Sequence, residues 1–304
     1  MSNYVVIDIG GTAVKYAFMD EESGILAKGS VPSPARTGTR EEFLALIDEI
    51  QKPWENQYAG IAVSAPGIID SRKGIIHVIG AFPCLRECPL KDILQERYHV
   101  PASVENDGKC AALAEVWKGA LAGKKDGAVF LIGTAIGGGI VLDGKLRRGD
   151  HFFAGEFSGA CTDIYHPADQ KNYLSELGTR CLIRKTAERY GEESAGLDGK
   201  AVFERINAGE EKACEALKEY TDLVAMAVFN INILLDLELF CIGGGISEQP
   251  ELIRSLKQSI QDIPLVHPDI LAGTKLPLPE VTACEMRADA NLSGALYHLL
   301  HESA

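Results

Sequence analysis

Three glycine-rich segments each follow a short apolar run and could cradle phosphate groups. They are Gly10-Gly11-Thr12, residues 133–139 (GTAIGGG) and Gly243-Gly244-Gly245. Because glycine has no Cβ, backbone N–H groups in such segments can approach phosphate oxygens closely. Any one Gly-Gly pair is also typical of a plain hairpin turn. The P-loop and Rossmann spacings are both absent, so the three segments together indicate a different nucleotide-binding geometry.

Asp8 lies inside the apolar run that precedes the first of these segments. A buried carboxylate is costly unless a partner stabilises its charge. Next to phosphates, hydrated Mg²⁺ is a natural partner, because this ion keeps several waters and binds through one or two carboxylates. Asp8 is therefore predicted to orient Mg²⁺ through water. Lys15 is close in sequence and could add charge, although a solvated strand lysine is its ordinary role.

Two further carboxylates are candidates for work on a sugar. Asp107 follows Asn106 where a predicted strand meets a predicted helix. Asp107 could be the general base that takes the proton of a hydroxyl attacking a γ-phosphate, with Asn106 holding a neighbouring hydroxyl. The competing structural role for Asp107 is the N-cap of the helix. Glu156, between Gly155 and Phe157, could accept hydrogen bonds from sugar hydroxyls.

These side chains need strands and helices to position them, and the hydrophobic pattern supplies both. A capping box at residues 39–42 begins a helix that buries Phe43, Ile47 and Ile50. Strands are expected at residues 4–9, 14–19, 60–64, 128–132, 140–142 and 239–242, and a further strand is expected to end at residues 104–105. Residues 133–139 are expected as a glycine turn and Asp143-Gly144 as a hairpin turn. Further helices are expected from residue 106, over about 210–236 and over 289–301.

Both halves of the chain open with a strand, a glycine turn and a returning strand, which indicates a duplicated αβ unit with a cleft between the copies. The 304 residues carry 30 Lys+Arg against 43 Asp+Glu, a formal net charge of −13. That charge argues against nucleic acid and against an anionic membrane surface as partners. The eight cysteines form no CxxC or CxC pair, and no targeting or membrane-spanning segment is evident. A cytoplasmic protein with reduced thiols is expected.

The segments occur in the order that is typical of the ROK family, which comprises sugar kinases and sugar-responsive repressors of the actin-like ATPase superfamily. The resemblance rests on DIGGT at 8–12, SAPG at 64–67, END at 105–107, GTAIGGG at 133–139, AGE at 154–156 and GGG at 243–245. DANLSGA at 289–295 resembles the start of the family's C-terminal helix. The match runs from Val5 to Leu300.

The resemblance implies a two-lobed α/β fold of the actin-like ATPase (ribonuclease H-like) type, with a duplicated βαβ core. It implies an N-terminal lobe of residues 1–118, rejoined by a C-terminal helix at 289–304, and a second lobe of residues 119–288. A sugar would bind in the interdomain cleft, and the lobes would close over it and Mg²⁺·ATP. The family is often dimeric, so a homodimer is possible, but no residue in the sequence decides this.

The resemblance also assigns roles. Asp107 would be the catalytic base, and the sugar would be bound by Asn106, Asp107, Glu156 and Gly67. ATP would be bound by Gly10, Gly11, Thr12, Gly133, Thr134, Gly137, Gly138, Gly243 and Gly244, with Asp8 holding Mg²⁺ through water.

Two departures from the family pattern bear on the substrate. Gly159 stands where family kinases carry a histidine that binds sugar and zinc, and Ser175 stands where a glutamate holds the anomeric hydroxyl. The family's cysteine-rich zinc stretch is also absent, so no zinc site is expected. Small residues at both positions leave room on the O1 side of the sugar. The segment AGEF at 154–157, followed by Thr162-Asp163, also resembles the β-glucoside kinases of this family. That resemblance implies phosphorylation of the 6-hydroxyl of the glucosyl unit of a β-glucoside such as cellobiose.

Three alternatives stay open. One is a ROK kinase for a free hexose such as glucose, fructose, allose or an N-acetylhexosamine. Another is a sugar-responsive regulator, but such proteins usually add a winged helix-turn-helix of ~60–80 residues before the first strand. That strand begins here at residue 5, so DNA binding is not expected. The third is a sugar-binding protein without catalysis, which is disfavoured by the presence of Asp8, Thr12, Asp107 and Thr134.

Overall fold

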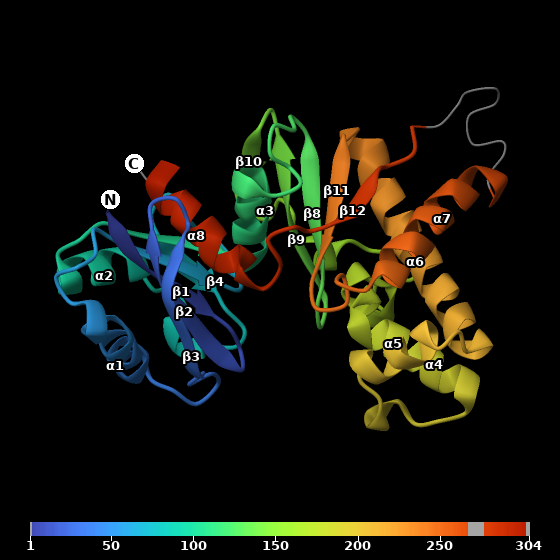
Figure 1. Cartoon of the computed structure of the whole chain (residues 1–304), viewed down its shortest axis with the longest axis horizontal. Coiled ribbons are helices and arrows are strands. Elements are labelled where there is room, and N and C mark those ends of the chain that lie inside the picture. Colours follow the sequence, from blue (N-terminus) through green and yellow to red (C-terminus); the bar gives the residue numbers. More distant parts are fainter. Residues whose placement is uncertain (1, 267–276, 302–304) are drawn as a thin grey trace. The chain divides into compact units, whose positions relative to one another are not determined.

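The computed structural model of the chain describes residues 2–266 and 277–301. It divides into two compact units (Figure 1). Unit 1 comprises Met1–Gly119, Arg148–Ala154 and Ala288–Ala304, and unit 2 comprises Ala120–Arg147 and Gly155–Arg287. Residues 302–304 of the predicted C-terminal helix and 267–276 of the predicted second lobe lie outside the described residues.

Unit 1 is built on a five-stranded mixed sheet of order β3-β2-β1-β4-β7. β1 pairs antiparallel with β2 and parallel with β4, which in turn pairs parallel with β7. Its strands are β1 (Asn3–Ile9), β2 (Ala13–Asp20), β3 (Ile25–Pro32), β4 (Ile61–Ala65) and β7 (Ala102–Asn106). A separate two-stranded sheet consists of β5 (Ile68–Asp70) and β6 (Ile75–Val78).

Both faces of this sheet are covered, which explains why β1 is apolar at successive positions. Val5 and Ile7 belong to a core on one face, and Val6 belongs to a second core on the other. The helices are α1 (Arg40–Gln51), α2 (Leu90–Tyr98), α3 (Asp107–Lys118) and α8 (Ala290–His301). α1 and α2 contribute to the Val5 core, and α3 and α8 to the Val6 core. α8, from the C-terminal part of the chain, thus covers one face of the sheet that contains β1.

The local signals in this unit are confirmed. Thr39 caps α1, with both hydrogen bonds of the capping box present, and Phe43, Ile47 and Ile50 are buried. The hairpin between β1 and β2 closes with Gly10 N–H donating to the Ala13 carbonyl (3.1 Å).

Unit 2 repeats the architecture with a sheet of order β10-β9-β8-β11-β12. Its strands are β8 (Gly127–Ile132), β9 (Ile136–Leu142), β10 (Lys145–Arg147), β11 (Leu239–Gly243) and β12 (Val281–Ala283). Its α-helices are α4 (Thr179–Tyr190), α5 (Gly199–Asn207), α6 (Glu211–Leu235) and α7 (Pro250–Val266). In each sheet an antiparallel meander leads into two further parallel strands. The predicted duplication is confirmed.

The predicted turn over residues 133–139 is too long. Only residues 133–135 connect β8 to β9, while Gly137, Gly138 and Gly139 pair with β8 as part of β9. A Cβ on Gly138 would lie 2.1 Å from the Val129 carbonyl oxygen and 2.6 Å from the Phe157 ring. Glycine is therefore needed in this strand to let the Phe157 ring pack against it, which a pattern of turn-forming residues cannot reveal.

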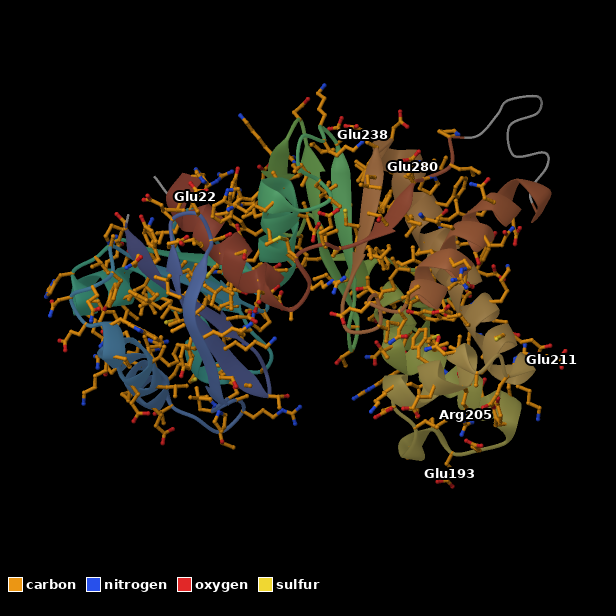
Figure 2. All side chains as sticks on the ribbon, in the orientation of Figure 1. Glu22, Glu193, Arg205, Glu211, Glu238 and Glu280 are labelled. Atoms are coloured by element: carbon orange, nitrogen blue, oxygen red, sulfur yellow. The ribbon has the colours of Figure 1, made fainter. Side chains whose placement is uncertain are left out.

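The acidic residues are spread over the surface of both units, and Figure 2 shows Glu193 and Glu211 pointing outward from unit 2. All eight cysteines are free thiols, and Cys110 and Cys241 are buried as expected. Within the described residues, no helix has the length and apolar character needed to cross a membrane.

Candidate active site

The predicted site residues of unit 1 gather where three parallel strands end. Asp8 on β1 is in register with Ser64 on β4, and Ala65 on β4 is in register with Asn106 on β7. The carboxyl ends of parallel strands meet at one edge of a sheet, which is where open α/β sheets bind ligands. The hairpin after β1 presents Gly11 and Thr12 exposed to solvent.

Asp8 is held by two hydrogen bonds to the same carboxylate oxygen. Ser64 Oγ donates to Asp8 Oδ1 at 2.7 Å, and Asn291 Nδ2 on α8 donates to it at 3.1 Å. Both bonds use Oδ1, so the orientation of the carboxylate is fixed without engaging Oδ2. The side chain is only 8% exposed.

Burial raises the pKa of Asp8 above its ordinary value, and the bonds from Ser64 and Asn291 and the charge of Lys15 only partly oppose this. A buried carboxylate with one oxygen engaged and the other available suits a hydrated Mg²⁺, whose charge would stabilise the ionised form. The donor set at Asp8 therefore fits the metal implied by the family pattern.

Asn106 is the N-cap of α3 and links two strand ends. Its Oδ1 accepts from the Lys109 N–H (3.0 Å), and its Nδ2 donates to the Gly67 carbonyl (2.9 Å). An amide nitrogen has two N–H groups, so one remains to reach a hydroxyl. Gly67 has φ of +106°, and a Cβ there would lie 1.9 Å from the Val78 carbonyl oxygen. This close packing fixes the Gly67 carbonyl that Asn106 binds.

Asp107 is the first residue inside α3, so its predicted alternative role as N-cap is wrong because Asn106 holds that position. Its Oδ1 accepts from the Gly108 N–H at 2.8 Å, and the side chain is partly exposed. A carboxylate in the first turn is stabilised by the helix dipole. This environment keeps the carboxylate oriented at the strand end, as a general base requires.

Glu105 is a buried residue to which the sequence analysis assigned no role. Its Oε1 accepts from the Asn106 N–H (2.8 Å), and its Oε2 accepts from Arg148 Nε (2.6 Å). Arg148 Nη2 also lies 3.4 Å from His298 Nδ1 on α8. Glu105 therefore fixes the backbone beside Asp107 and also binds residues 148–154 to unit 1.

The glycine segments of unit 2 lie at adjacent strand ends. β8 and β11 are parallel neighbours, with Gly243 in register with Leu131. Gly244 has φ of +95°, and a Cβ there would lie 2.1 Å from the Ile132 carbonyl oxygen. The structure thus brings Gly243 and Gly244 beside the Gly133–Thr134 turn.

The Gly133–Thr134 turn is also braced from outside the sheet. The Thr179 N–H at the start of α4 donates to the Gly133 carbonyl at 2.8 Å. The Ile136 N–H donates to Ser158 Oγ at 3.2 Å, and that hydroxyl donates back to the Ile136 carbonyl. Since residues 133–135 are exposed but held at both ends, their shape is preorganised.

Glu156 belongs to the segment of unit 2 that packs against β9, next to the Gly133–Thr134 turn. Gly155, with φ of +85°, packs against the Gly138 carbonyl. The ring centroids of Phe157 and Phe130 lie 5.5 Å apart, with the rings tilted by 31°. Glu156 lies between Gly155 and Phe157 and precedes the short 3₁₀ helix Phe157–Gly159. Its position therefore depends on the glycines that the sequence analysis placed in a turn.

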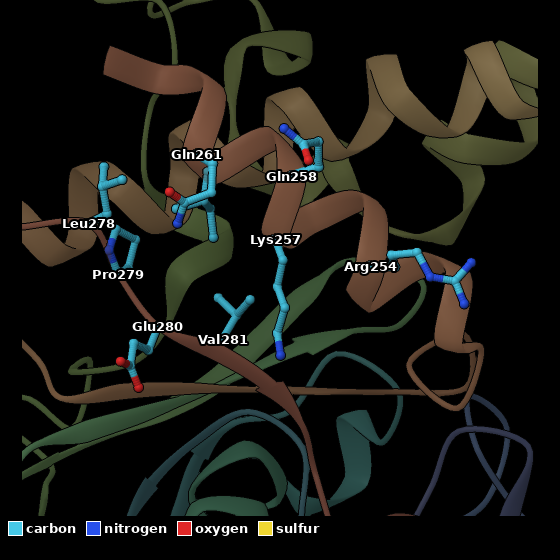
Figure 3. A pocket seen from close by; sticks show the side chains of 9 residues that line it. Arg254, Lys257, Gln258, Gln261, Leu278, Pro279, Glu280 and Val281 are labelled. Atoms are coloured by element: carbon cyan, nitrogen blue, oxygen red, sulfur yellow. The ribbon is translucent and has the colours of Figure 1, made fainter. Parts of the chain in front are cut away.

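A groove between α7 and β12 is separate from these residues. It has a volume of about 670 Å³, and Figure 3 shows Lys257 on α7 pointing toward β12 across it. None of the predicted site residues lines it. Among the described residues, no group of three or more His, Cys, Asp or Glu side chains is arranged to hold a metal.

Several residues around the site were not predicted to act there. Ser64 and Asn291 lie within two of the motifs, SAPG at 64–67 and DANLSGA at 289–295. The signal that could have indicated a role for each was a polar side chain in an otherwise apolar segment. Lys109, two residues after Asp107, is only 1% exposed. The sequence signal for the burial of Lys109 was its position within an otherwise apolar helix face.

A family model described as the ROK family matches residues 4–301. The chain belongs to the ROK family. A β-glucoside kinase from Listeria monocytogenes is 31% identical to this chain over 299 residues. The match covers 97% of this chain and 96% of the relative.

Solved structures of ROK family proteins are similar to this chain. A ROK family protein from Streptococcus pneumoniae in complex with sucrose is 32% identical with a TM-score of 0.86, over 99% of this chain and 98% of that one. A ROK family glucokinase from Streptomyces griseus in complex with glucose and AMPPNP is 25% identical with a TM-score of 0.79, over 97% and 98%. The predicted α/β actin-like ATPase fold and the prediction of an ATP-dependent carbohydrate kinase are confirmed for this ROK chain.

Proposed function

We propose that this ROK kinase transfers the γ-phosphoryl group of ATP to the 6-hydroxyl of a glucosyl unit in a β-glucoside such as cellobiose. The observation that carries the substrate class is the space at Gly159, where the family pattern has a sugar-binding histidine. A Cβ built on Gly159 would meet no atom within 4 Å. Ser175, in the 3₁₀ helix Leu174–Leu177, likewise replaces a larger glutamate.

Two comparisons support a substituent on the O1 side. The Listeria monocytogenes relative is a β-glucoside kinase, and the Streptococcus pneumoniae protein was solved with sucrose, a disaccharide. A site that had to recognise a free anomeric hydroxyl would need hydrogen-bonding groups there, because buried polar groups discriminate strongly between substrates that pair with them and those that do not. Gly159 offers no side chain for this purpose.

Asp107 acts as the general base in the proposed reaction. As O6 bonds to the γ-phosphorus, the bond from that phosphorus to the bridging oxygen of ADP breaks, and Asp107 takes the hydroxyl proton. Asn106 and Glu156 hold neighbouring sugar hydroxyls, and the Gly67 carbonyl fixes Asn106. The backbone N–H groups near Gly10, Gly11, Thr12, Gly133 and Thr134 surround the phosphates, and Gly243 and Gly244 border the adenosine. Gly137 and Gly138 support the phosphate turn from within β9.

Asp8 would hold Mg²⁺ through water, and the bound ion would neutralise charge on the ATP phosphates. We further propose that the enzyme acts in the cytoplasm, where ATP is available. The eight free thiols support a reducing compartment.

A kinase for a free hexose is the second candidate, favoured by the glucose-bound Streptomyces griseus structure. A coupled ADP-release assay with Mg²⁺·ATP separates the two. The acceptors would be cellobiose, gentiobiose, an aryl β-glucoside, glucose and N-acetylmannosamine. A higher kcat/KM for the β-glucosides than for glucose supports the proposal. A preference for a free hexose would retain the kinase and reject the β-glucoside. Activity on no acceptor would favour a sugar-binding protein without catalysis.

A further inference from the structure

Phe153 is an exposed aromatic residue three positions before Glu156. It is 61% exposed, and of the exposed large hydrophobic residues that the structure describes, only Phe153 and Tyr165 are aromatic. A single exposed apolar side chain is ordinary on a protein surface. What distinguishes Phe153 is the backbone that presents its ring, because that backbone is closed, strained and anchored at both ends.

Residues 148–154 form a closed loop of unit 1. The Ala154 N–H donates to the Arg148 carbonyl at 3.1 Å, which brings the two ends of the loop together. Within the loop, Phe152 has φ of +61°, in the left-handed region that bulky L-residues rarely adopt. Such conformations persist only where the surrounding structure enforces them, and they cluster at binding and catalytic sites. This strained turn separates the half-buried Phe152 from the exposed Phe153.

The start of the loop is anchored beside Asp107. Arg148 Nε donates to Glu105 Oε2 at 2.6 Å, and the Glu105 side chain is almost fully buried. Glu105 lies near the end of β7, two residues before Asp107. Hydrogen bonds between charged groups are short and strong, and they hold their partners in a defined geometry. The loop that presents Phe153 is therefore fixed to the strand end that carries the proposed base.

The end of the loop leads directly to Glu156. Gly155 is buried and packs against Gly138 of β9, so the chain is fixed again immediately after the loop. Three residues of extended chain span at most about 11 Å, which limits the separation between the Cα atoms of Phe153 and Glu156. That length is comparable with one or two sugar rings. The Phe153 ring is thus within reach of a sugar whose hydroxyls Glu156 holds.

An exposed phenyl ring suits the flat face of a β-glucoside. The substituents of a β-glucopyranose are equatorial, so each face of the sugar ring presents C–H groups. These faces pack on an aromatic side chain, which buries apolar surface of both partners and sets C–H groups against the negative face of the ring. An aryl group stacks in a similar way. Gly159 gives the aglycone room but no side chain, so a side chain of another segment is needed to contact it.

We propose that the Phe153 ring is the surface on which the aglycone of the acceptor stacks. The aglycone is the second glucosyl ring of cellobiose or the aryl group of an aryl β-glucoside. This inference rests on the proposed function and names the residue that recognises the acceptor beyond its phosphorylated glucosyl unit. Because the loop is fixed before the acceptor arrives, little conformational entropy is lost when the aglycone binds.

Steady-state kinetics with phenyl β-glucoside and methyl β-glucoside test the proposal. Both acceptors carry a substituent on O1, but only the phenyl group can stack. In the wild-type chain the KM for phenyl β-glucoside should be lower by roughly 10-fold at similar kcat, and Phe153→Ala should lose this advantage. Phe153→Tyr keeps an aromatic ring and should retain it. Leu26→Ala is the matched control, because Leu26 is 56% exposed on β3 of the same unit.

Thermal unfolding of each variant shows that it folds, and little change is expected because both side chains are exposed. Equal KM values for the two acceptors in the wild-type chain would overturn the inference but leave the β-glucoside kinase standing, and so would an advantage that survives in Phe153→Ala. Loss of the advantage in Phe153→Tyr or in Leu26→Ala would also reject stacking on this ring. A wild-type chain that prefers glucose to every β-glucoside would instead reject the proposed function, and this inference with it.

Discussion

Ser64 and Asp8 stand opposite each other on the parallel strands β4 and β1, and the Ser64 hydroxyl donates a 2.7 Å hydrogen bond to one oxygen of the Asp8 carboxylate. The bond holds a buried charge in a fixed orientation without cancelling the cost of its burial. Burial of the Asp8 carboxylate therefore costs stability, and this cost can be measured separately from the proposed role of Asp8 in catalysis.

Asp8→Asn should abolish most kinase activity and yet stabilise the fold. Burial raises the pKa of Asp8 in the folded state, so ionising it there costs more than in the unfolded chain. The neutral amide removes that cost, and we expect a gain of about 0.5–2 kcal/mol in the free energy of unfolding at pH 7. The gain should shrink as the pH falls through the folded pKa toward ~3.9, the unfolded value, because Asp8 is then protonated in both states. Urea unfolding at pH 7 and pH 5 checks this, and a gain that grows toward pH 5 would contradict it.

Asp107→Asn should lower kcat by about 10²–10⁴-fold, since the amide cannot accept the proton of O6. Asp92→Asn is the matched control, because Asp92 is also an acidic first-turn residue of a unit 1 helix and is exposed. Steady-state kinetics with saturating Mg²⁺·ATP provide the measurement. Near-normal turnover by Asp107→Asn would remove Asp107 from the role of base.

Glu105→Gln should destabilise the protein by about 1.5–3 kcal/mol, because Arg148 loses a charged hydrogen-bond partner that is itself buried. The isosteric amide can still accept the Asn106 N–H through its oxygen, so the loss reports mainly on the ion pair. Lys125→Gln breaks the exposed pair with Asp143 and should change stability far less than Glu105→Gln, because solvent screens that pair. Chemical denaturation measures the change in the free energy of unfolding for both variants. Equal changes would show that the buried Glu105–Arg148 pair contributes no more to stability than the exposed Lys125–Asp143 pair.

Gly159→His should convert the acceptor preference toward free glucose. The added side chain would occupy the space that we propose for the aglycone, and kcat/KM for cellobiose should fall at least ~10-fold relative to that for glucose. Gly196→His is the matched control, because a Cβ there also meets no atom within 4 Å. An unchanged cellobiose-to-glucose ratio in Gly159→His would mean that Gly159 does not border the acceptor.

Purified protein should contain less than about 0.1 zinc per chain, since the cysteine-rich ligand pattern of a structural zinc site is missing from the sequence. Inductively coupled plasma mass spectrometry on protein prepared without added metal measures this directly. A chelator such as EDTA should likewise leave the thermal unfolding temperature unchanged. One zinc per chain would overturn the prediction.

Much of the fold could be predicted because its signals are local. The capping box at Thr39, the start of α3 at Asn106 and the Asp143-Gly144 hairpin each depend on a few neighbouring residues. Asp143 and Gly144 have φ of 54° and 72°, as a two-residue turn between β9 and β10 requires.

The features that were missed depend on residues far apart in sequence. Asn291 reaches Asp8 across 283 positions, and Arg148 reaches Glu105 across 43. No periodicity or spacing records such pairs. The error at Gly138 has a different cause, because a glycine in a strand is easily taken for a turn residue unless the Phe157 ring that packs against it is known.

The packing of α8 on the sheet of unit 1 affects the order in which the parts of the protein can fold during synthesis. Leu292 and Leu296 of α8 fill the core beside Val6, and Asn291 supplies one of the two bonds that orient Asp8. A ribosome makes these residues after all of unit 2 has been synthesised. The core on this face of the first sheet is therefore filled only after unit 2 has been synthesised, and the nascent chain cannot form the Asn291–Asp8 hydrogen bond before then.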